Sequence, residues 1–137
     1  MVRPWTFAAA MVAGALTAVP ALLTTQALAL DVNSFRAQHR LPPLSPSGAL
    51  SAAAHSHARD MAARQSLDHN GFRERMVGSI GAENVAYGCA DADCAYQMWA
   101  KSAGHRANML MKGITSYGLA SATAEGGRSY GVLELGN

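Results

Sequence analysis

Residues 81–88, with the sequence GAENVAYG, form a short apolar segment that begins with a carboxylate, Glu83, and an amide, Asn84. A run of this length, bounded by glycines, predicts a buried strand over Glu83 to Tyr87. A carboxylate at such a position needs a partner, because burying an unpaired charge is costly. The surroundings of Glu83 are therefore the strongest constraint that this sequence places on its fold.

The first 29 residues have the pattern of a secretory signal peptide. Arg3 precedes an almost entirely apolar run over residues 7–19, and Ala27-Leu28-Ala29 has the small-x-small form of a cleavage site. The alternative is a retained membrane anchor, but Pro20 and the polar residues 24–26 interrupt the run before the ~20 residues needed to cross a bilayer. We expect cleavage near Ala29, a mature chain beginning near Leu30 or Asp31, secretion to an extracellular or periplasmic location, and no membrane span after cleavage.

Residues 30–137 then form one domain, which is a common size for a single core. The net charge is only +2, and no cluster of lysine or arginine marks a nucleic-acid surface. The common nucleotide-binding and hydrolase motifs are absent from the sequence. No oligomerisation signal is present either.

Two cysteines, Cys89 and Cys94, stand in the run CADADC. Secretion favours a disulfide between them, because oxidising compartments preserve such bonds. The alternative, a metal site, would require two further ligands.

The rest of the chain predicts short helices and strands. Five helices are expected: over residues 31–39, from a cap at Ser47 to Arg64 or Gln65, over 72–77, after a cap at Asp93, and over 105–111. Strands are expected over 83–87, 117–124 and 129–135, and a hairpin turn joins the last two. This order favours an α+β domain over a Rossmann-type repeat.

Two histidines flank the strand and are candidates for chemistry with Glu83. His69 lies in a polar turn before it, and His105 follows Gly104 at a helix start. Imidazole and carboxylate groups form general-base pairs and ligate zinc. The alternative is a purely structural hydrogen-bonding role for each histidine. His57, on the apolar stripe of the second helix, is expected to be a buried, hydrogen-bonded core residue.

Four segments in series resemble one family: the opening FRAQHRLPPL, then AHSHARDMA with LDHN, then GAENVAYG, and finally WAKSAGHRANML. Together they resemble the CAP superfamily of cysteine-rich secretory proteins, antigen 5 and pathogenesis-related 1 proteins. The similarity is greatest to the small bacterial SCP-like domains. It covers nearly all of the chain after the leader.

The resemblance implies an α-β-α sandwich with a small antiparallel sheet between helical layers. It also implies a polar cavity that binds zinc or another divalent metal in several members. By motif, His69, Glu83 and His105 match cavity residues and would be the metal ligands. Ser102 and Tyr130 stand where the eukaryotic pattern has its second glutamate and second histidine.

Three functions follow as hypotheses. The first is a binding module for a lipid, a sterol or another small apolar ligand. The second is a metal-dependent hydrolase or protease with Glu83 as the catalytic base. The third is an interaction domain whose polar cluster only ties the sheet to the helices. We rank binding or interaction above catalysis, because a fold does not fix a function.

Overall fold

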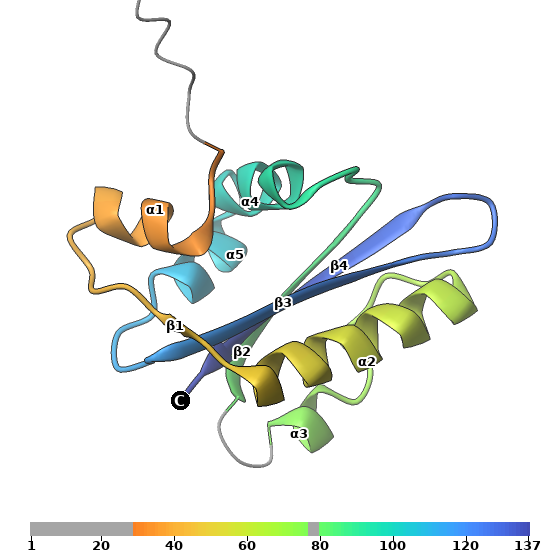
Figure 1. The fold of residues 1–137 in the computed structure, drawn as a ribbon, viewed down its shortest axis with the longest axis horizontal. Helices are drawn as coiled ribbons and strands as arrows, with labels where there is room; N and C mark the ends of the chain where they lie inside the picture. The colour runs from red at the N-terminus through yellow and green to blue at the C-terminus, as the bar shows by residue number, and fades with distance from the viewer. Residues whose placement is uncertain (1–28, 77–79) are drawn as a thin grey trace, which may run out of the picture.

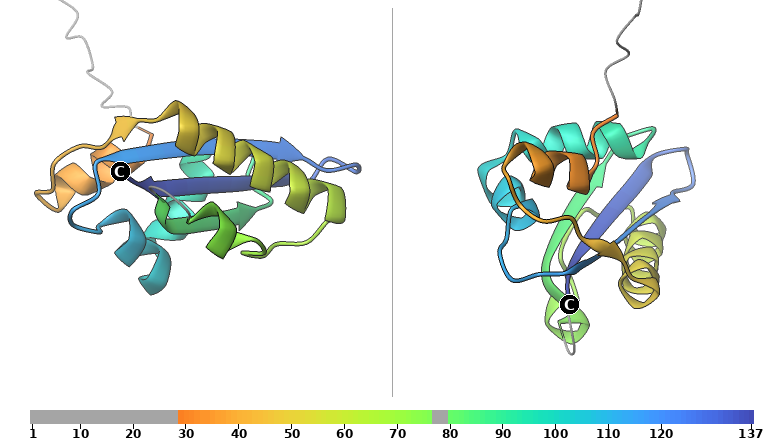
Figure 2. Two further views of the ribbon diagram at one scale, coloured as in Figure 1. Left: turned by 90° about the horizontal axis from the view of Figure 1, so that it is seen from below. Right: turned by 60° about the vertical axis from the view of Figure 1, so that its left-hand side comes forward.

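A four-stranded sheet lies between two layers of helices in the computed structural model, which describes residues 29–76 and 80–137 (Figures 1 and 2). The predicted leader lies outside the described residues except for Ala29. Helix α2 (Gly48–Arg64) packs on one face of the sheet, and α1 (Val32–Gln38), α4 (Ala92–Ala100) and α5 (Ala103–Met109) lie on the other side. The expected three-layer α-β-α sandwich is confirmed.

The strands are β1 (Ser45–Pro46), β2 (Ile80–Tyr87), β3 (Ser116–Thr123) and β4 (Ser129–Gly136), in the order β1-β3-β4-β2. Strands β2, β3 and β4 pair antiparallel, as expected, and the β3–β4 hairpin has its turn where it was predicted. The short β1 pairs parallel with β3, so the sheet is mixed. This strand was not predicted, because two residues carry no detectable period.

The predicted cap at Ser47 is confirmed, since its side chain accepts a hydrogen bond from the backbone N–H of Leu50 in the first turn of α2. Asp31 caps α1 in the same way, accepting from the backbone N–H of Ser34. The predicted cap at Asp93 is wrong: Asp91, in extended backbone, accepts a hydrogen bond from the backbone N–H of Cys94 and begins α4. Both aspartates suit the role, and only the chain path after β2 decides between them.

The short helices differ from their predicted ranges by a few residues. Helix α3 (Phe72–Arg75) is one turn long, and residue 77 of the predicted segment lies outside the described residues. Helix α5 begins two residues before the predicted start and ends at Met109, not at Met111. Short segments with few apolar residues define their ends poorly in sequence.

Side chains alternate across β2 and β4, so each face of the sheet has its own core. Facing α2 are Val85, Tyr130 and Val132, which pack with Ala54, Ala58 and Met61. The opposite face carries Ala86, Leu133 and Leu135, which pack with Phe35, Trp99 and Met109. The same alternation sends Glu83 toward α2 and Asn84 toward α5.

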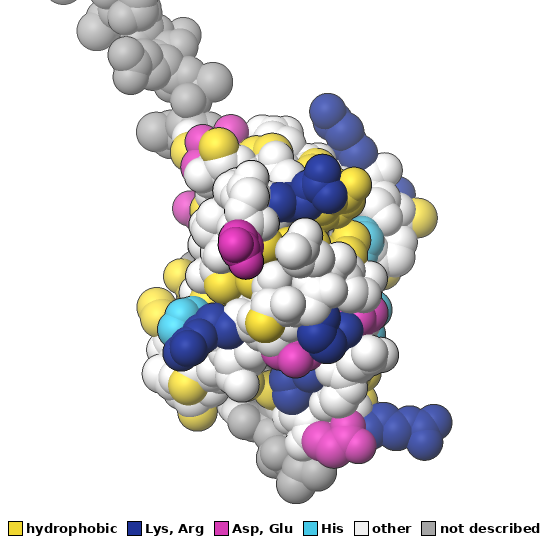
Figure 3. All heavy atoms as spheres, turned by 90° about the vertical axis from the view of Figure 1, so that its right-hand side faces the viewer, with side chains coloured by type: hydrophobic (Ala, Val, Ile, Leu, Met, Phe, Trp, Pro, Cys, Tyr) yellow, Lys and Arg dark blue, Asp and Glu magenta, His cyan; other side chains and the backbone are white. Residues whose placement is uncertain are grey.

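The surface carries both signs of charge. Figure 3 shows the end of the molecule where the β3–β4 hairpin and the loop before α4 lie, with basic and acidic side chains interspersed and apolar side chains visible between them. Within residues 29–76 and 80–137, no helix has the length and apolar character to cross a membrane.

Helix α2 lies against β3 at a glycine. A Cβ added to Gly118 would collide with the backbone of Leu50 and Ser51 in the first turn of α2. The small residue lets the alanine-rich helix approach the sheet closely, and that approach positions the rest of α2 over the strands.

The close contact predicts that Gly118→Ala destabilises the protein. The added methyl group meets backbone atoms that cannot rotate away, so we expect a loss of about 1–3 kcal/mol in the free energy of unfolding by urea. Gly104→Ala, in α5 with open space around it, is the matched control and should be neutral or slightly stabilising. Equal stability of Gly118→Ala and wild type would contradict the packing described above.

Candidate functional site

Two glutamates lie side by side on adjacent strands of the sheet. Glu83 of β2 and Glu134 of β4 are direct partners in the antiparallel register. Their exposed fractions are 4% and 0%. Two buried carboxylates at such close range cannot both be ionised without a large cost, so the charges around them decide how the site is organised.

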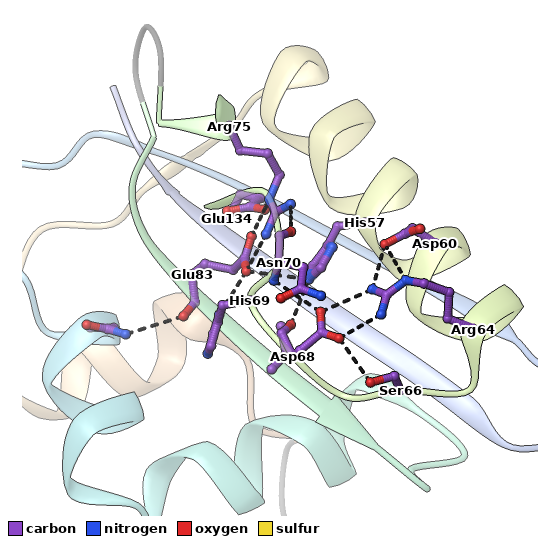
Figure 4. Close-up of polar contacts among 12 residues, drawn as sticks. His57, Asp60, Arg64, Ser66, Asp68, His69, Asn70, Arg75, Glu83 and Glu134 are labelled. Carbon is purple, nitrogen blue, oxygen red and sulfur yellow. Dashed lines mark hydrogen bonds and ion pairs between the residues drawn. The ribbon is translucent and has the colours of Figure 1, made fainter. Parts of the chain in front are cut away.

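Arg75, from the end of α3, supplies the compensating charge (Figure 4). Its Nε donates to Glu83 Oε2 at 2.7 Å, and its Nη2 donates to Glu83 Oε1 at 2.8 Å. This is the bidentate geometry in which guanidinium and carboxylate groups pair most strongly. Arg75 Nε also lies 3.4 Å from Glu134 Oε1, so one cation serves both carboxyl groups.

The two carboxyl groups have pKa values on opposite sides of neutrality. Burial and the neighbouring Glu83 raise the pKa of Glu134 to about 9. Burial also opposes ionisation of Glu83, but the adjacent Glu134 carboxyl and the hydrogen bonds from Arg75 and His69 outweigh it and hold the pKa of Glu83 below its usual value. At neutral pH the site therefore contains one carboxylate, one carboxylic acid and one guanidinium, and its charges balance.

A neutral Glu134 also accounts for its hydrogen bonding. Neither of its oxygens receives a hydrogen bond from the residues that the structure describes. An ionised group in that position would depend on Arg75 Nε alone, at 3.4 Å. A protonated Glu134 instead has an O–H donor beside the Glu83 carboxylate, which is the cheaper way to bury the pair.

Two histidines complete the contacts of Glu83. His69 Nδ1 lies 2.8 Å from Glu83 Oε1, and because that oxygen belongs to a carboxylate, the imidazole N–H is the donor. His57 of α2 donates from Nε2 to the backbone carbonyl of Asp68 at 2.8 Å and lies 3.6 Å from Glu83 Oε1. The expectation that His57 is buried and hydrogen-bonded is confirmed.

His105 approaches β2 from the other side, on α5. Its Nδ1 lies 2.9 Å from Ser102 Oγ, and its backbone carbonyl accepts a hydrogen bond from the buried Asn84 side chain at 3.0 Å. Burial, followed by the electrostatic effect of nearby His69, lowers the pKa of His105. Asn84 thus joins α5 to the strand that carries Glu83.

Of the three predicted residues, His69 and Glu83 are in direct contact. His105 lies on the other face of β2, where its backbone carbonyl contacts Asn84 and not Glu83. Sequence reasoning missed Arg75 and Glu134. Glu134 could have been identified from the sequence, because it is a carboxylate within the apolar run 132–135, just as Glu83 is a carboxylate beside the apolar run that follows it. Arg75 carried none, because its contact depends on where α3 docks.

Glu83 fits poorly as a metal ligand in this arrangement. Arg75 occupies both of its oxygens, and His69 shares one of them. In the described part of the chain, no group of three or more His, Cys, Asp or Glu side chains is placed to hold a metal ion. The three-ligand set of His69, Glu83 and His105, and Glu83 as a catalytic base, remain predictions.

A separate apolar pocket lies on the opposite face of the sheet, beside the loop before α4. The predicted disulfide between Cys89 and Cys94 is present and closes this loop. The pocket has a volume of about 210 Å³ and is lined mainly by small side chains, among them Ala86, Ala95 and Gly131. It shares Cys89, Ala90 and Ser129 with an adjoining hollow of about 340 Å³ that contains Arg128.

Comparison with known proteins places this geometry in a family. Residues 31–135 match the model of the cysteine-rich secretory protein family, CAP. An extracellular protein containing an SCP domain, from Bacillus anthracis str. Ames, is 25% identical with a TM-score of 0.61; the match covers 75% of this chain but only 37% of that protein. An outer surface protein from Borrelia burgdorferi is 13% identical with a TM-score of 0.63, covering 77% of this chain and 86% of that one, and shows the fold alone. No curated protein matches the chain.

The carboxyl pair predicts a specific dependence of stability on pH. In the unfolded chain Glu134 titrates near 4.5, and in the folded protein its pKa is about 9. Between these values the folded state holds a proton that the unfolded state has released, so the free energy of unfolding falls as pH rises. The lowered pKa of Glu83 acts in the opposite sense and only at more acidic pH.

Glu134→Gln keeps the shape of the side chain and removes its titration. We expect it to flatten the decline measured by urea unfolding between about pH 5 and pH 9, by up to about 1.4 kcal/mol per pH unit. Glu74→Gln, at an exposed position of α3, is the control and should retain the wild-type slope. An unchanged slope in Glu134→Gln would show that Glu134 is ionised in the folded protein.

Proposed function

This chain belongs to the cysteine-rich secretory protein (CAP) family, and from that premise we propose that it is an extracellular binding domain for a small amphipathic ligand. The apolar end of the ligand occupies the pocket beside the Cys89–Cys94 loop. The catalytic alternative, a hydrolase or protease with Glu83 as base, has less support, because both oxygens of Glu83 are engaged by Arg75.

An extracellular location is supported by three observations. The sequence begins with the features of a secretory leader. A disulfide joins Cys89 and Cys94, and such bonds persist in oxidising compartments. The structural relatives are described as an extracellular protein and an outer surface protein.

The composition of the pocket wall is the observation that carries the proposed ligand class. Side chains of β2, β3, β4 and the start of α4 meet there, and most of them are alanine, glycine or serine. Small side chains leave the sheet face uncovered next to the aromatic and aliphatic core around Trp99 and Leu133. Concave, mostly apolar sites of this kind take hydrocarbon groups.

The adjoining hollow supports an anionic head group on the ligand. Arg128 lies in it and stacks over the ring of Tyr87 at 5.1 Å from its centroid. The carboxylate of Asp91, at the pocket wall, is already used to cap α4. A fatty acid, with one hydrocarbon chain and one carboxylate, fits the pocket and the hollow together.

We expect saturable binding of a fluorescent fatty acid, and its loss when the pocket is filled. Ser121 is an exposed pocket residue on β3, so Ser121→Phe should place a ring in the pocket and weaken binding at least tenfold. Thr123→Phe, two residues further along the same face and outside the pocket lining, is the matched control. Equal affinity of Ser121→Phe and wild type would place the ligand elsewhere.

Arg128→Ala distinguishes the contribution of the ligand's head group to binding from that of its hydrocarbon chain. Removing the guanidinium should weaken binding of the fatty acid about tenfold, the scale of one charge-assisted hydrogen bond, and leave binding of an uncharged sterol probe unchanged. Equal effects on both probes would argue against a head-group contact.

A metal site at the two histidines is the second candidate. The observation that favours it is that His69 and His105 each use Nδ1 for a hydrogen bond, so Nε2 is the nitrogen left for a ligand bond. In this arrangement Glu83 would orient His69 rather than bind the ion, as carboxylates often do for zinc-bound histidines. The lowered pKa of His105 favours the neutral imidazole that a metal requires.

Zinc titration by calorimetry tests this candidate. Micromolar binding by the wild type should be lost in His69→Ala and in His105→Ala, and should weaken about 10–100-fold in Glu83→Gln, as expected for an orienting partner. His55→Ala, at an exposed position of α2, is the control. Absence of zinc binding by the wild type would remove the metal site and, with it, the metallohydrolase.

A further inference from the structure

The backbone nitrogen of Leu30 makes an unusual contact for a residue at the start of a domain. It donates to the carboxylate Oδ1 of Asp93, 63 residues further along the chain in the first turn of α4, at 2.6 Å. The Leu30 side chain packs against the core beneath α1 and α4. Ala29, immediately before it, is exposed.

We propose that the Ala29–Leu30 bond is the processing site of this protein, and that the α-amino group freed on Leu30 forms an ion pair with Asp93 that fixes the mature N-terminus to α4. In the reaction water adds OH to the carbonyl carbon of Ala29 and a proton to the nitrogen of Leu30. At neutral pH the products are a carboxylate on the leader and an ammonium group on the domain.

The contacts of Leu30 favour cleavage of the Ala29–Leu30 bond over cleavage of the Leu30–Asp31 bond. The leader sequence alone allows a mature start at Leu30 or Asp31. Cleavage after Leu30 would discard both the packed side chain and the nitrogen that meets Asp93. Cleavage after Ala29 keeps both and changes only the charge of the nitrogen.

That change of charge strengthens an existing contact. The uncleaved chain offers Asp93 a single neutral amide N–H, whereas the mature chain offers an ammonium group, and charge-assisted hydrogen bonds are roughly twice as strong. The nearby carboxylates have other partners: Asp31 accepts from the backbone of Ser34, and Asp91 accepts from the backbone of Cys94. Asp93 otherwise meets only the Gln97 amide, at 3.5 Å, among the contacts of the described residues.

The first part of the test is the identity of the N-terminus. The full chain with its leader is expressed in a secreting bacterium, and the N-terminal peptide of the exported protein is determined by mass spectrometry. A start at Leu30 is expected. A start at Asp31 or later, or a retained leader, would overturn the proposal.

The second part measures the ion pair. Domains beginning at Leu30 and at Ala29 are compared, because the additional alanine turns the Leu30 nitrogen back into an amide without changing the core. The Leu30 start should raise the Tm by about 4 °C or more, and Asp93→Asn should abolish this difference. Asp91→Asn is the matched control: asparagine still caps α4, so the difference should persist.

Two results would exclude the ion pair. Equal Tm values for the Leu30 and Ala29 starts in the wild-type background would show that the ammonium group adds nothing. A difference that survives Asp93→Asn would show that the added residue, not the charge, affects stability. Neither result depends on ligand or metal binding, so the outcome is independent of the function proposed above.

Discussion

The fold is organised around a charge balance between β2, at the edge of the sheet, and its neighbour β4. Glu83 and Glu134 occupy facing positions of β2 and β4, and the pair is tolerated because Arg75 supplies one positive charge and Glu134 keeps one proton. His69 and His57 bring the loop after α2, and α2 itself, to the same carboxylate. One polar cluster thus joins α2, the loop after it and α3 to the same strand, and removing Arg75 would leave the buried carboxyl pair without its guanidinium partner.

The sequence predicts the elements of this fold better than the contacts between them. Strong periodic segments and hairpin signals located α2, β3 and β4, and the apolar run located β2 with Glu83 inside it. The choice between Asp91 and Asp93 as a helix cap, and the existence of β1, depend on the path of the chain in space. Arg75 could not be identified for the same reason: an arginine in a polar segment becomes a site residue only when its helix docks.

The polar cluster and the apolar pocket lie on opposite faces of the sheet. Glu83 points toward α2, whereas the pocket opens beside the loop before α4. The sheet therefore separates the polar cluster around Glu83 from the apolar pocket.

Helix α3 buries none of its side chains fully, and the guanidinium of Arg75 ties it to the buried carboxyl pair. Segments with few apolar contacts open locally at a fraction of the free energy needed to unfold the whole domain. Detachment of this single turn would remove Arg75 and expose the carboxyl pair to water while the sheet and both hydrophobic cores stay packed.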